Sequence, residues 1–208
     1  MGNHENCADW DYETHPKQKT LKGACDRLTA AIAKNPEKFN RFGFDTRPAH
    51  RFLFKPFVPK DCTCLAGTYR GSPSCPELHR LDVGVRGTAV GTPAAFVEMA
   101  MHLLDERCKS LLAAYAARVS APGADEALAF ALLVDVLCDL LELFFSVHPY
   151  ANGNGHMGRL LAWALFAQHG FAPRNWSVDS KQPYGKALDA YRKGDRRPLR
   201  LFLVKLSR

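Results

Sequence analysis

The sequence lacks the features that would mark the chain as secreted, membrane-spanning or repetitive. Its first 20 residues are polar and carry four acidic side chains, so we expect no secretory signal. It contains no internal repeat and no low-complexity tract. The most apolar run, residues 127–147, is interrupted by Asp135, Asp139 and Glu142 at helical spacing, which predicts an amphipathic helix with one polar stripe instead of a membrane span.

Acidic residues are in the minority. The chain has 28 lysines and arginines against 21 acidic residues, which gives a net charge of +7 and a pI of about 9.1. A basic excess suits phosphorylated ligands, nucleic acid or acidic proteins, and charge alone does not distinguish them. The most basic stretch, residues 192–200, lacks the interleaved aromatic side chains of a nucleic-acid platform, so we expect a solvated face and no nucleic-acid partner.

The cysteines do not indicate a disulfide framework. They number seven, which is odd, and without a secretory signal we expect reduced thiols in a cytoplasm. Cys62, Cys64, Cys75 and His79 form a C-x-C and C-x-x-x-H arrangement that is only loosely similar to a set of zinc ligands, with ordinary thiols as the alternative. A chain of 208 residues with 47% hydrophobic and 24% charged residues is typical of one globular domain.

Apolar residues at helical spacing predict a mainly helical chain. Residues 1–16 have no such periodicity and are interpreted as a loose leader, and the phenylalanine-rich residues 39–59 as an irregular but packed segment. Between residues 65 and 90, turn-forming residues separate short β-capable pieces, which predicts one β-hairpin, the only strand pair expected. The helices are expected over residues 18–34, 92–119, 127–145, 156–170, 181–193 and 196–206.

The most informative stretch is residues 147–160, V-H-P-Y-A-N-G-N-G-H-M-G-R-L, which lies between two apolar helical segments. Pro149 and the glycines after it end the first helix close to His148. The Gly-Asn-Gly turn at residues 153–155 tolerates positive φ and leads into a helix whose first amides can bind an anion. Arg159, one turn into that helix, can hold further phosphates, and a neutral His148 can accept a proton from a hydroxyl.

Each of these features has a purely structural alternative. His148 can cap the carbonyl groups at a helix end, and the Gly-Asn-Gly turn can be no more than a tight connection between helices. Arg159 can form a salt bridge with an acidic residue of the preceding helix. The combination of an imidazole, a glycine turn and a helix N-terminus favours an anion-binding site.

This stretch resembles the signature of the Fic domain, His-x-Phe-x-Asp/Glu-Gly-Asn-Gly-Arg-x-x-Arg, which spans twelve positions. The resemblance implies a mainly α-helical, Fic-like bundle over residues 40–208, preceded by a leader and helix at residues 1–39, with a short β-hairpin flap over the active site. The chain departs from the signature at Asn152 and His156, and Tyr150 replaces the phenylalanine. The matching residues are His148, Gly153, Asn154, Gly155 and Arg159.

The resemblance implies a protein adenylyltransferase that moves AMP from ATP to a Ser, Thr or Tyr hydroxyl. It makes His148 the general base and assigns Asn154 and Arg159 to the phosphates. The segment after the signature is similar to the part of Fic domains that closes the base pocket, so Tyr184 and Tyr191 are candidate nucleotide contacts, with packing under the last helix as the alternative.

The two departures, Asn152 and His156, are expected to affect the binding of the metal ion and of the phosphates. In the family, the residue at the position of Asn152 is a carboxylate that helps to bind Mg²⁺; an amide carries no negative charge, so we expect weaker metal binding. His156 replaces an arginine and removes a permanent charge, and each charged hydrogen bond lost weakens binding by on the order of 1.5–3 kcal/mol. Reduced activity, altered nucleotide choice and a different donor are all compatible with these changes.

The flap of Fic proteins holds its target by strand addition, and the resemblance therefore implies a protein substrate as partner beside ATP. The inhibitory pattern Ser/Thr-x-x-x-Glu-Gly/Asn is absent from the sequence, so restraint comes from a separate protein, is missing, or is unnecessary. Two alternatives remain: transfer of another group such as UMP or phosphocholine, and a nucleotide-binding relic. We expect no membrane contact and a cytoplasmic location, with a secreted effector in a host cytoplasm as the alternative. The expected flap residues are Tyr69, Arg70, Leu81, Asp82 and Val83.

Overall fold

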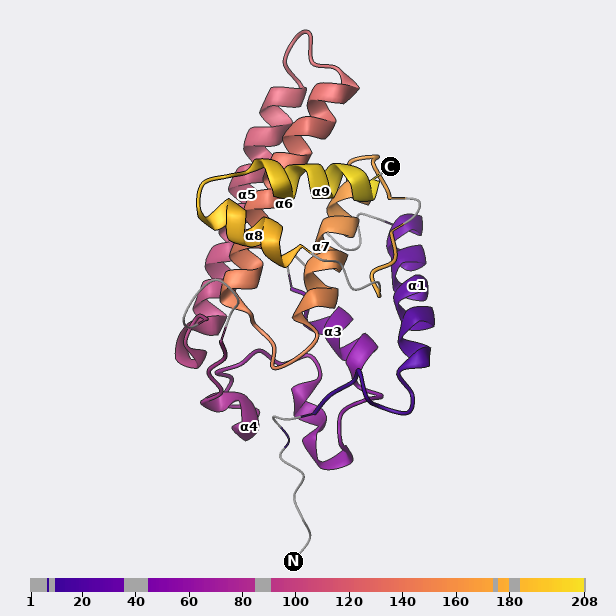
Figure 1. Ribbon diagram of the computed structural model, residues 1–208, viewed down its shortest axis with the longest axis vertical. Coiled ribbons are helices and arrows are strands. Elements are labelled where there is room, and N and C mark those ends of the chain that lie inside the picture. The colour runs from indigo at the N-terminus through magenta and orange to yellow at the C-terminus, as the bar shows by residue number, and fades with distance from the viewer. Residues whose placement is uncertain are drawn as a thin grey trace, which may run out of the picture.

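The computed structural model describes residue 7 and residues 10–35, 45–84, 91–173, 176–179 and 184–207. Over these residues the chain is mainly helical and contains no strand, which confirms the predicted helical class (Figure 1). The helices are α1 (Lys19–Lys34), α3 (Arg47–Phe54), α4 (Pro76–His79), α5 (Val97–Val119), α6 (Glu126–Val147), α7 (Asn154–Gln168), α8 (Gly185–Arg192) and α9 (Arg197–Ser207), with 3-10 helices η2 (Lys60–Leu65) and η3 (Ala94–Phe96).

Helix α7 lies at the centre of the core. Twelve of its 15 residues are buried, because α1 packs on it from one side and α6 from another. The crossing with α6 is close: a Cβ atom added to Gly158 would lie 2.4 Å from the Phe145 ring. Because the buried residues include Asn154 and His156, the N-terminal turn of α7 is packed in the core as well.

Helices α5 and α6 form an antiparallel pair whose far end projects beyond the rest of the molecule (Figure 1). Helix α6 begins where the Asp125 side chain accepts a hydrogen bond from the Leu128 amide at 2.8 Å, a standard N-cap. None of the helices that the structure describes combines the length and the apolar character needed to cross a bilayer.

The polar stripe predicted on α6 pairs with the basic segment at the end of the chain. Arg196 lies 2.8 Å from Asp139, and Arg200 lies 2.9 Å from Asp135. Arg192 likewise contacts Glu142, at 3.2 Å. Residues 193–197 and 200 are exposed, so the expected solvated face is confirmed for most of this segment, and three of its arginines also form ion pairs with α6. These same contacts occupy the acidic residues that the structural alternative assigned to Arg159.

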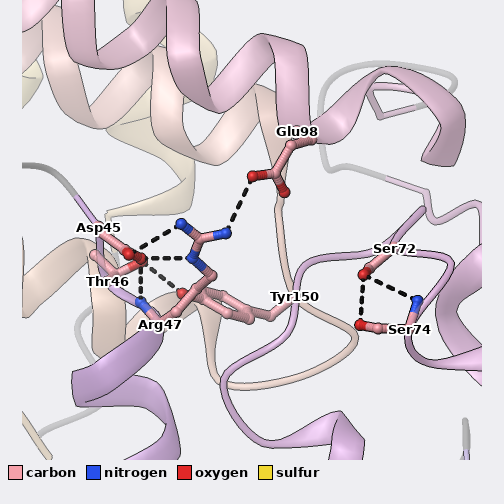
Figure 2. A network of polar contacts seen from close by, with 7 residues as sticks. All are labelled: Asp45, Thr46, Arg47, Ser72, Ser74, Glu98 and Tyr150. Atoms are coloured by element: carbon pink, nitrogen blue, oxygen red, sulfur yellow. Dashed lines mark hydrogen bonds and ion pairs between the residues drawn. The ribbon is translucent and has the colours of Figure 1, made fainter.

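Two segments interpreted as irregular are more ordered than expected. Residues 47–54 form α3, whose start is braced by Asp45: its carboxylate accepts hydrogen bonds from the Arg47 backbone amide at 3.0 Å and from the Arg47 side chain (Figure 2). The leader interpretation is wrong for residues 10–12, since Trp10 and Tyr12 are buried and pack against the Phe54 ring. Hydrophobic periodicity could not reveal either segment because both are short and aromatic. Residues 36–44 lie outside the described part of the chain.

The predicted β-hairpin is not confirmed. Residues 65–84 contain turns and the short helix α4 but no strand, and residues 85–90 lie outside the described part. Two prolines, at positions 73 and 76, have no amide to donate to a strand ladder. The carbonyl of Leu81, which a strand would use, accepts a hydrogen bond from the side chain of Arg70 at 2.8 Å.

Four cysteines form disulfide bonds, contrary to the expectation of reduced thiols. Cys7 is bonded to Cys62, and Cys64 to Cys75, with Cα–Cα distances of 5.7 and 5.6 Å. The loosely zinc-like set is consequently not available as thiolates. Its histidine, His79, instead lies with Nδ1 3.4 Å from the Gly71 carbonyl oxygen.

Candidate functional site

A cavity of about 620 Å³ opens at the amino end of α7. This volume lies within the range of small-molecule sites in proteins. The walls come from the segment before α1, the end of α6, the loop into α7, the first turn of α7 and the loop that follows it. The lining residues are Tyr12, Glu13, Gln18, His148, Ala151, Asn152, Gly153, Asn154, Gly155, His156, Arg159, Asp179 and Tyr184.

His148 stands at the C-terminus of α6 in a left-handed conformation, with φ 51° and ψ 62°. Among the described residues it is the only one other than glycine with positive φ, and such strain persists where surrounding contacts enforce it. Here the enforcing group is Arg70, a fully buried arginine whose Nε donates to the His148 carbonyl at 2.8 Å. The same guanidinium donates to the carbonyls of Val147 and Thr92, each at 3.0 Å.

The imidazole of His148 is electrostatically tuned toward its neutral form. Burial, and secondarily the charge of Arg70, lower the pKa of His148 to about 4, and the Phe145 backbone carbonyl only partly offsets this. Its Nδ1 atom is enclosed and makes no hydrogen bond of normal geometry with any described group. The ring is therefore neutral at physiological pH, as an imidazole that accepts a proton must be.

Tyr150 anchors the loop between α6 and α7. Its ring is fully buried and stacked on His50, with centroids 3.8 Å apart, and its hydroxyl lies 2.6 Å from the Thr46 hydroxyl (Figure 2). Asn154 holds the backbone of Tyr150. The Oδ1 atom of Asn154 accepts a hydrogen bond from the Tyr150 amide at 2.9 Å, and its Nδ2 atom donates one to the Tyr150 carbonyl at 2.8 Å. Both polar atoms of the Asn154 side chain thus hold the turn, and the phosphate role expected of Asn154 stays a prediction.

The glycine turn has the conformation that an anion cradle needs. Gly153 has φ +80°, and a Cβ atom there would lie 2.4 Å from the Phe54 ring, so only glycine fits. The first hydrogen bond of α7 runs from the Met157 amide to the Gly153 carbonyl at 3.1 Å. The amides of residues 154–156 therefore have no intrahelical acceptor and lie at the positive end of the helix dipole.

Arg159 lies beside this turn and is 95% buried, with 5% of its surface exposed. Its Nε donates to the Val178 carbonyl at 2.6 Å, and its Nη1 lies 3.4 Å from the Tyr184 hydroxyl. It is the only arginine or lysine among the described residues that line the cavity. Tyr184 thus joins the site as expected, whereas Tyr191 does not line the cavity and donates its hydroxyl hydrogen to Asp139.

The two departures from the Fic signature have partners of their own. Asn152 accepts a hydrogen bond on Oδ1 from the Gly153 amide at 2.8 Å and donates from Nδ2 to the Trp10 carbonyl at 3.2 Å. Its side-chain oxygen is therefore engaged, and the side chain carries no charge. Residue 152 does not fit a Mg²⁺ ligand, so no step of a mechanism is assigned to a metal held there.

His156 is placed between the segment before α1 and the loop after α7. Its Nε2 lies 3.2 Å from the carboxylate of Asp179, and its Nδ1 lies 3.4 Å from the Tyr12 hydroxyl. Burial lowers the pKa of His156, although the hydrogen bond to Asp179 acts in the opposite direction. A neutral His156 adds no positive charge to the cavity, which leaves Arg159 as the fixed cation among the described lining residues.

Comparison of the chain with models of known protein families and with curated proteins found no match.

The residues expected to bind a target have structural roles. Tyr69 and Arg70 are buried, 3% and 0% exposed, and Leu81 gives its carbonyl to Arg70. Asp82 accepts from the Ala94 amide at 2.7 Å and so caps the helical segment that precedes α5. Val83 accepts from the Gly91 amide at 3.0 Å, which brings the two ends of residues 83–91 together.

Outside residues 147–160, sequence reasoning missed four lining residues: Tyr12, Glu13, Gln18 and Asp179. Tyr12 and Glu13 lie in the aperiodic segment interpreted as a leader, and Asp179 lies in a loop outside the signature. No local pattern marks such residues, because they reach the cavity only through the packing of α1 and of the loop after α7. The pair of buried aromatics at positions 10 and 12 was the one available signal of packing.

Proposed function

We propose that this chain is a Fic-like nucleotidyltransferase that moves AMP from ATP to a hydroxyl group of a protein substrate. The observation that carries the proposal is that His148, the free amides of α7 and Arg159 line one cavity. A base and an anion cradle on the same cavity wall are what transfer of a phosphate-containing group to a hydroxyl requires.

The proposed reaction is a displacement at the α-phosphorus. The oxygen of the acceptor hydroxyl forms a bond to that phosphorus, its proton passes to the unprotonated nitrogen of His148, and the bond to the β-phosphate oxygen breaks. Pyrophosphate leaves with the electron pair of that bond, and His148 later returns its proton to water. The amides at residues 154–156 and the Arg159 guanidinium stabilise the negative charge that develops on the phosphate oxygens.

The rest of the site supports the orientation of these groups. Arg70 holds the backbone of His148 in place, and the pair Tyr150 and Asn154 fixes the glycine turn. Tyr184, beside Arg159, offers an aromatic surface for a nucleotide base. Since His156 and Asn152 supply no charge, the expected activity is lower than that of a chain with the full signature.

The test is incubation of the full chain and a cell lysate with ATP, CTP, GTP or UTP labelled at the α-phosphate. We expect transfer of label from ATP to protein, its loss in His148→Ala, and its retention in His102→Ala, a matched change at an exposed histidine of α5. Label from UTP or another nucleotide alone would overturn ATP as the donor. Label that persists in His148→Ala would overturn the role of His148, and no label from any nucleotide would leave the relic as the better interpretation.

A further inference from the structure

Three side chains of different chemistry converge beside the cavity. The thiol of Cys25 in α1, a ring nitrogen of His156 in α7 and a carboxylate oxygen of Asp179 all lie within 4.8 Å of one another. Cys25 is 1% exposed and His156 is 3% exposed, while Asp179 is partly open to the cavity. These three potential metal ligands come from three separate segments of the chain.

We propose that Cys25, His156 and Asp179 bind one divalent transition-metal ion of the zinc class. Thiolate, imidazole and carboxylate are the three ligand types that Zn²⁺ accepts, whereas Mg²⁺ does not accept a thiolate. Bonds of about 2.0–2.3 Å in a tetrahedron place ligand atoms about 3.4–3.8 Å apart. The observed separations of up to 4.8 Å therefore need to contract by only about 1 Å.

The surroundings of His156 suit such a site. Since Nε2 faces Asp179 and Nδ1 faces Tyr12, Nε2 is the nitrogen directed at the metal. Nδ1 then carries the proton and donates it to the Tyr12 hydroxyl, which in turn lies 3.5 Å from the Glu13 carboxylate. A hydrogen-bonded chain of this kind behind a metal-binding histidine fixes its tautomer and orientation.

The charges around the cluster balance. A thiolate on Cys25 and the carboxylate of Asp179 together neutralise a divalent ion, and binding releases the thiol proton of Cys25 to solvent. Outside the three ligands, Arg159 and Lys22 contribute positive charge, while Glu13 and Asp26 contribute negative charge. The site is thus neutral with its ion, and neither set of neighbours dominates.

His156 and Asp179 both line the cavity, so the fourth position of the metal faces it and takes a water molecule. A site with three protein ligands and one open position is typical of reactive rather than purely structural zinc. The inference does not depend on the proposed transfer of AMP. The side chains that hold the metal are neither the base of that reaction nor hydrogen-bond donors to the phosphates.

The test uses the full chain without nucleotide and without reductant, so that Cys64 and Cys75 stay paired and offer no competing thiolates. The chain is incubated with Zn²⁺ or Co²⁺, freed of excess metal by gel filtration, and analysed for metal content and for the Co²⁺ absorption spectrum. We expect one equivalent of metal, a thiolate-to-Co²⁺ charge-transfer band and the ligand-field bands of four-coordinate Co²⁺. Less than a tenth of an equivalent, or a spectrum without the thiolate band, would overturn the site.

Variants identify the ligands. Cys25→Ser should abolish the thiolate band, while Cys108→Ser, at another buried free cysteine, should leave it unchanged. Asp179→Asn and Tyr12→Phe should each weaken the apparent Kd by about tenfold or more. If Cys25→Ser does not fold, as judged by circular dichroism, the Asp179→Asn measurement decides, since an unchanged Kd would contradict the proposal. The binding assay needs no nucleotide, so its failure is distinct from a failure of AMP transfer.

Discussion

Arg70 donates a hydrogen bond from Nε to the carbonyl oxygen of His148 at 2.8 Å, and this contact links the candidate base to a buried cation 78 residues earlier in the chain. The guanidinium also caps the C-terminal carbonyl of Val147 at 3.0 Å, where the negative end of the α6 dipole favours a positive charge. The Arg70 backbone amide donates to the Pro149 carbonyl at 2.8 Å. One residue therefore holds the helix end, the strained residue and the start of the signature loop.

Replacement of Arg70 by lysine should show whether the charge of this residue is enough, or whether the hydrogen bonds of its guanidinium are needed. Lysine keeps the charge but loses the planar fork that reaches four carbonyl groups, so we expect the free energy of unfolding to fall by on the order of 3 kcal/mol. Label transfer per folded molecule should fall as well, because the left-handed backbone of His148 loses its main partner. Urea denaturation measures the first effect and the labelling assay the second.

Arg118→Lys is the matched control, since Arg118 is exposed near the end of α5 and the change there should alter stability by less than about 0.5 kcal/mol. If Arg70→Lys behaves like Arg118→Lys in both assays, Arg70 does not position His148.

The ionisation of His148 provides a test that needs no substrate. Because burial and the Arg70 charge lower its pKa to about 4, the imidazole signals should titrate with a midpoint near pH 4 in NMR spectra of the full chain. Comparison with spectra of His148→Ala assigns the signals. A midpoint near the ordinary value of about 6.5 would show that the ring is solvated in the free protein.

His50 should make stability depend on pH. It is fully buried, its Nδ1 accepts from the Gly67 amide at 2.9 Å, and its Nε2–H donates to the Asn152 carbonyl at 3.0 Å. Burial lowers its pKa to about 3 in the folded chain, whereas the unfolded value is about 6.5. The unfolded chain therefore binds the extra proton first as the pH falls, and stability is lost progressively below about pH 6.5 until the folded pKa is reached.

Between pH 7 and pH 5 this residue alone should lower the free energy of unfolding by at most about 2 kcal/mol. Denaturation curves of the wild type and His50→Gln at both pH values give the difference. The glutamine variant should be less stable than the wild type at pH 7. Its free energy of unfolding should fall less between pH 7 and pH 5. An equal loss in both proteins would show that His50 is not the group responsible.

The sequence predicted the part of the site that local chemistry determines. Pro149 ends α6 at Val147, and Gly153 precedes a helix that begins at Asn154. Proline restricts the backbone and stops a helix, whereas glycine permits the turn from which the next helix starts. His148, Arg159 and Tyr184 are brought to the same cavity. The role of Asn154 was missed because its side chain binds a backbone four residues away, a contact that depends on how the loop closes.

The parts of the fold and of the site that were not predicted depend on long-range packing, which produces no periodic pattern in a sequence. The buried Arg70 and the exposed Asp82 lie in the segment that was expected to form a flap, yet each satisfies backbone groups of other segments. Tyr12 reaches the cavity only because α1 carries the preceding residues against α7. The disulfide bonds were also unpredictable, since cysteine spacing alone does not define which thiols meet.

Gly153 and Gly123 form a matched pair for testing the glycine turn. Both have positive φ, +80° and +84°, so alanine is strained at each by on the order of 1 kcal/mol. A Cβ atom at Gly123 meets nothing within 4 Å, whereas at Gly153 it would lie 2.4 Å from the Phe54 ring and 3.1 Å from His50. We expect Gly123→Ala to cost about 1 kcal/mol of stability and Gly153→Ala about 1–3 kcal/mol more.

The additional loss of stability in Gly153→Ala over Gly123→Ala measures how tightly the turn is packed against α3, because the backbone strain is common to both variants. Since the same turn leads into the amides of α7 that we propose bind phosphate, Gly153→Ala should also weaken the binding of ATP at a temperature where both variants remain folded, and Gly123→Ala should not. Isothermal titration with ATP gives the Kd values. Equal stabilities for the two variants would mean that the Phe54 ring moves aside, and equal ATP affinities would mean that the turn does not form the phosphate cradle.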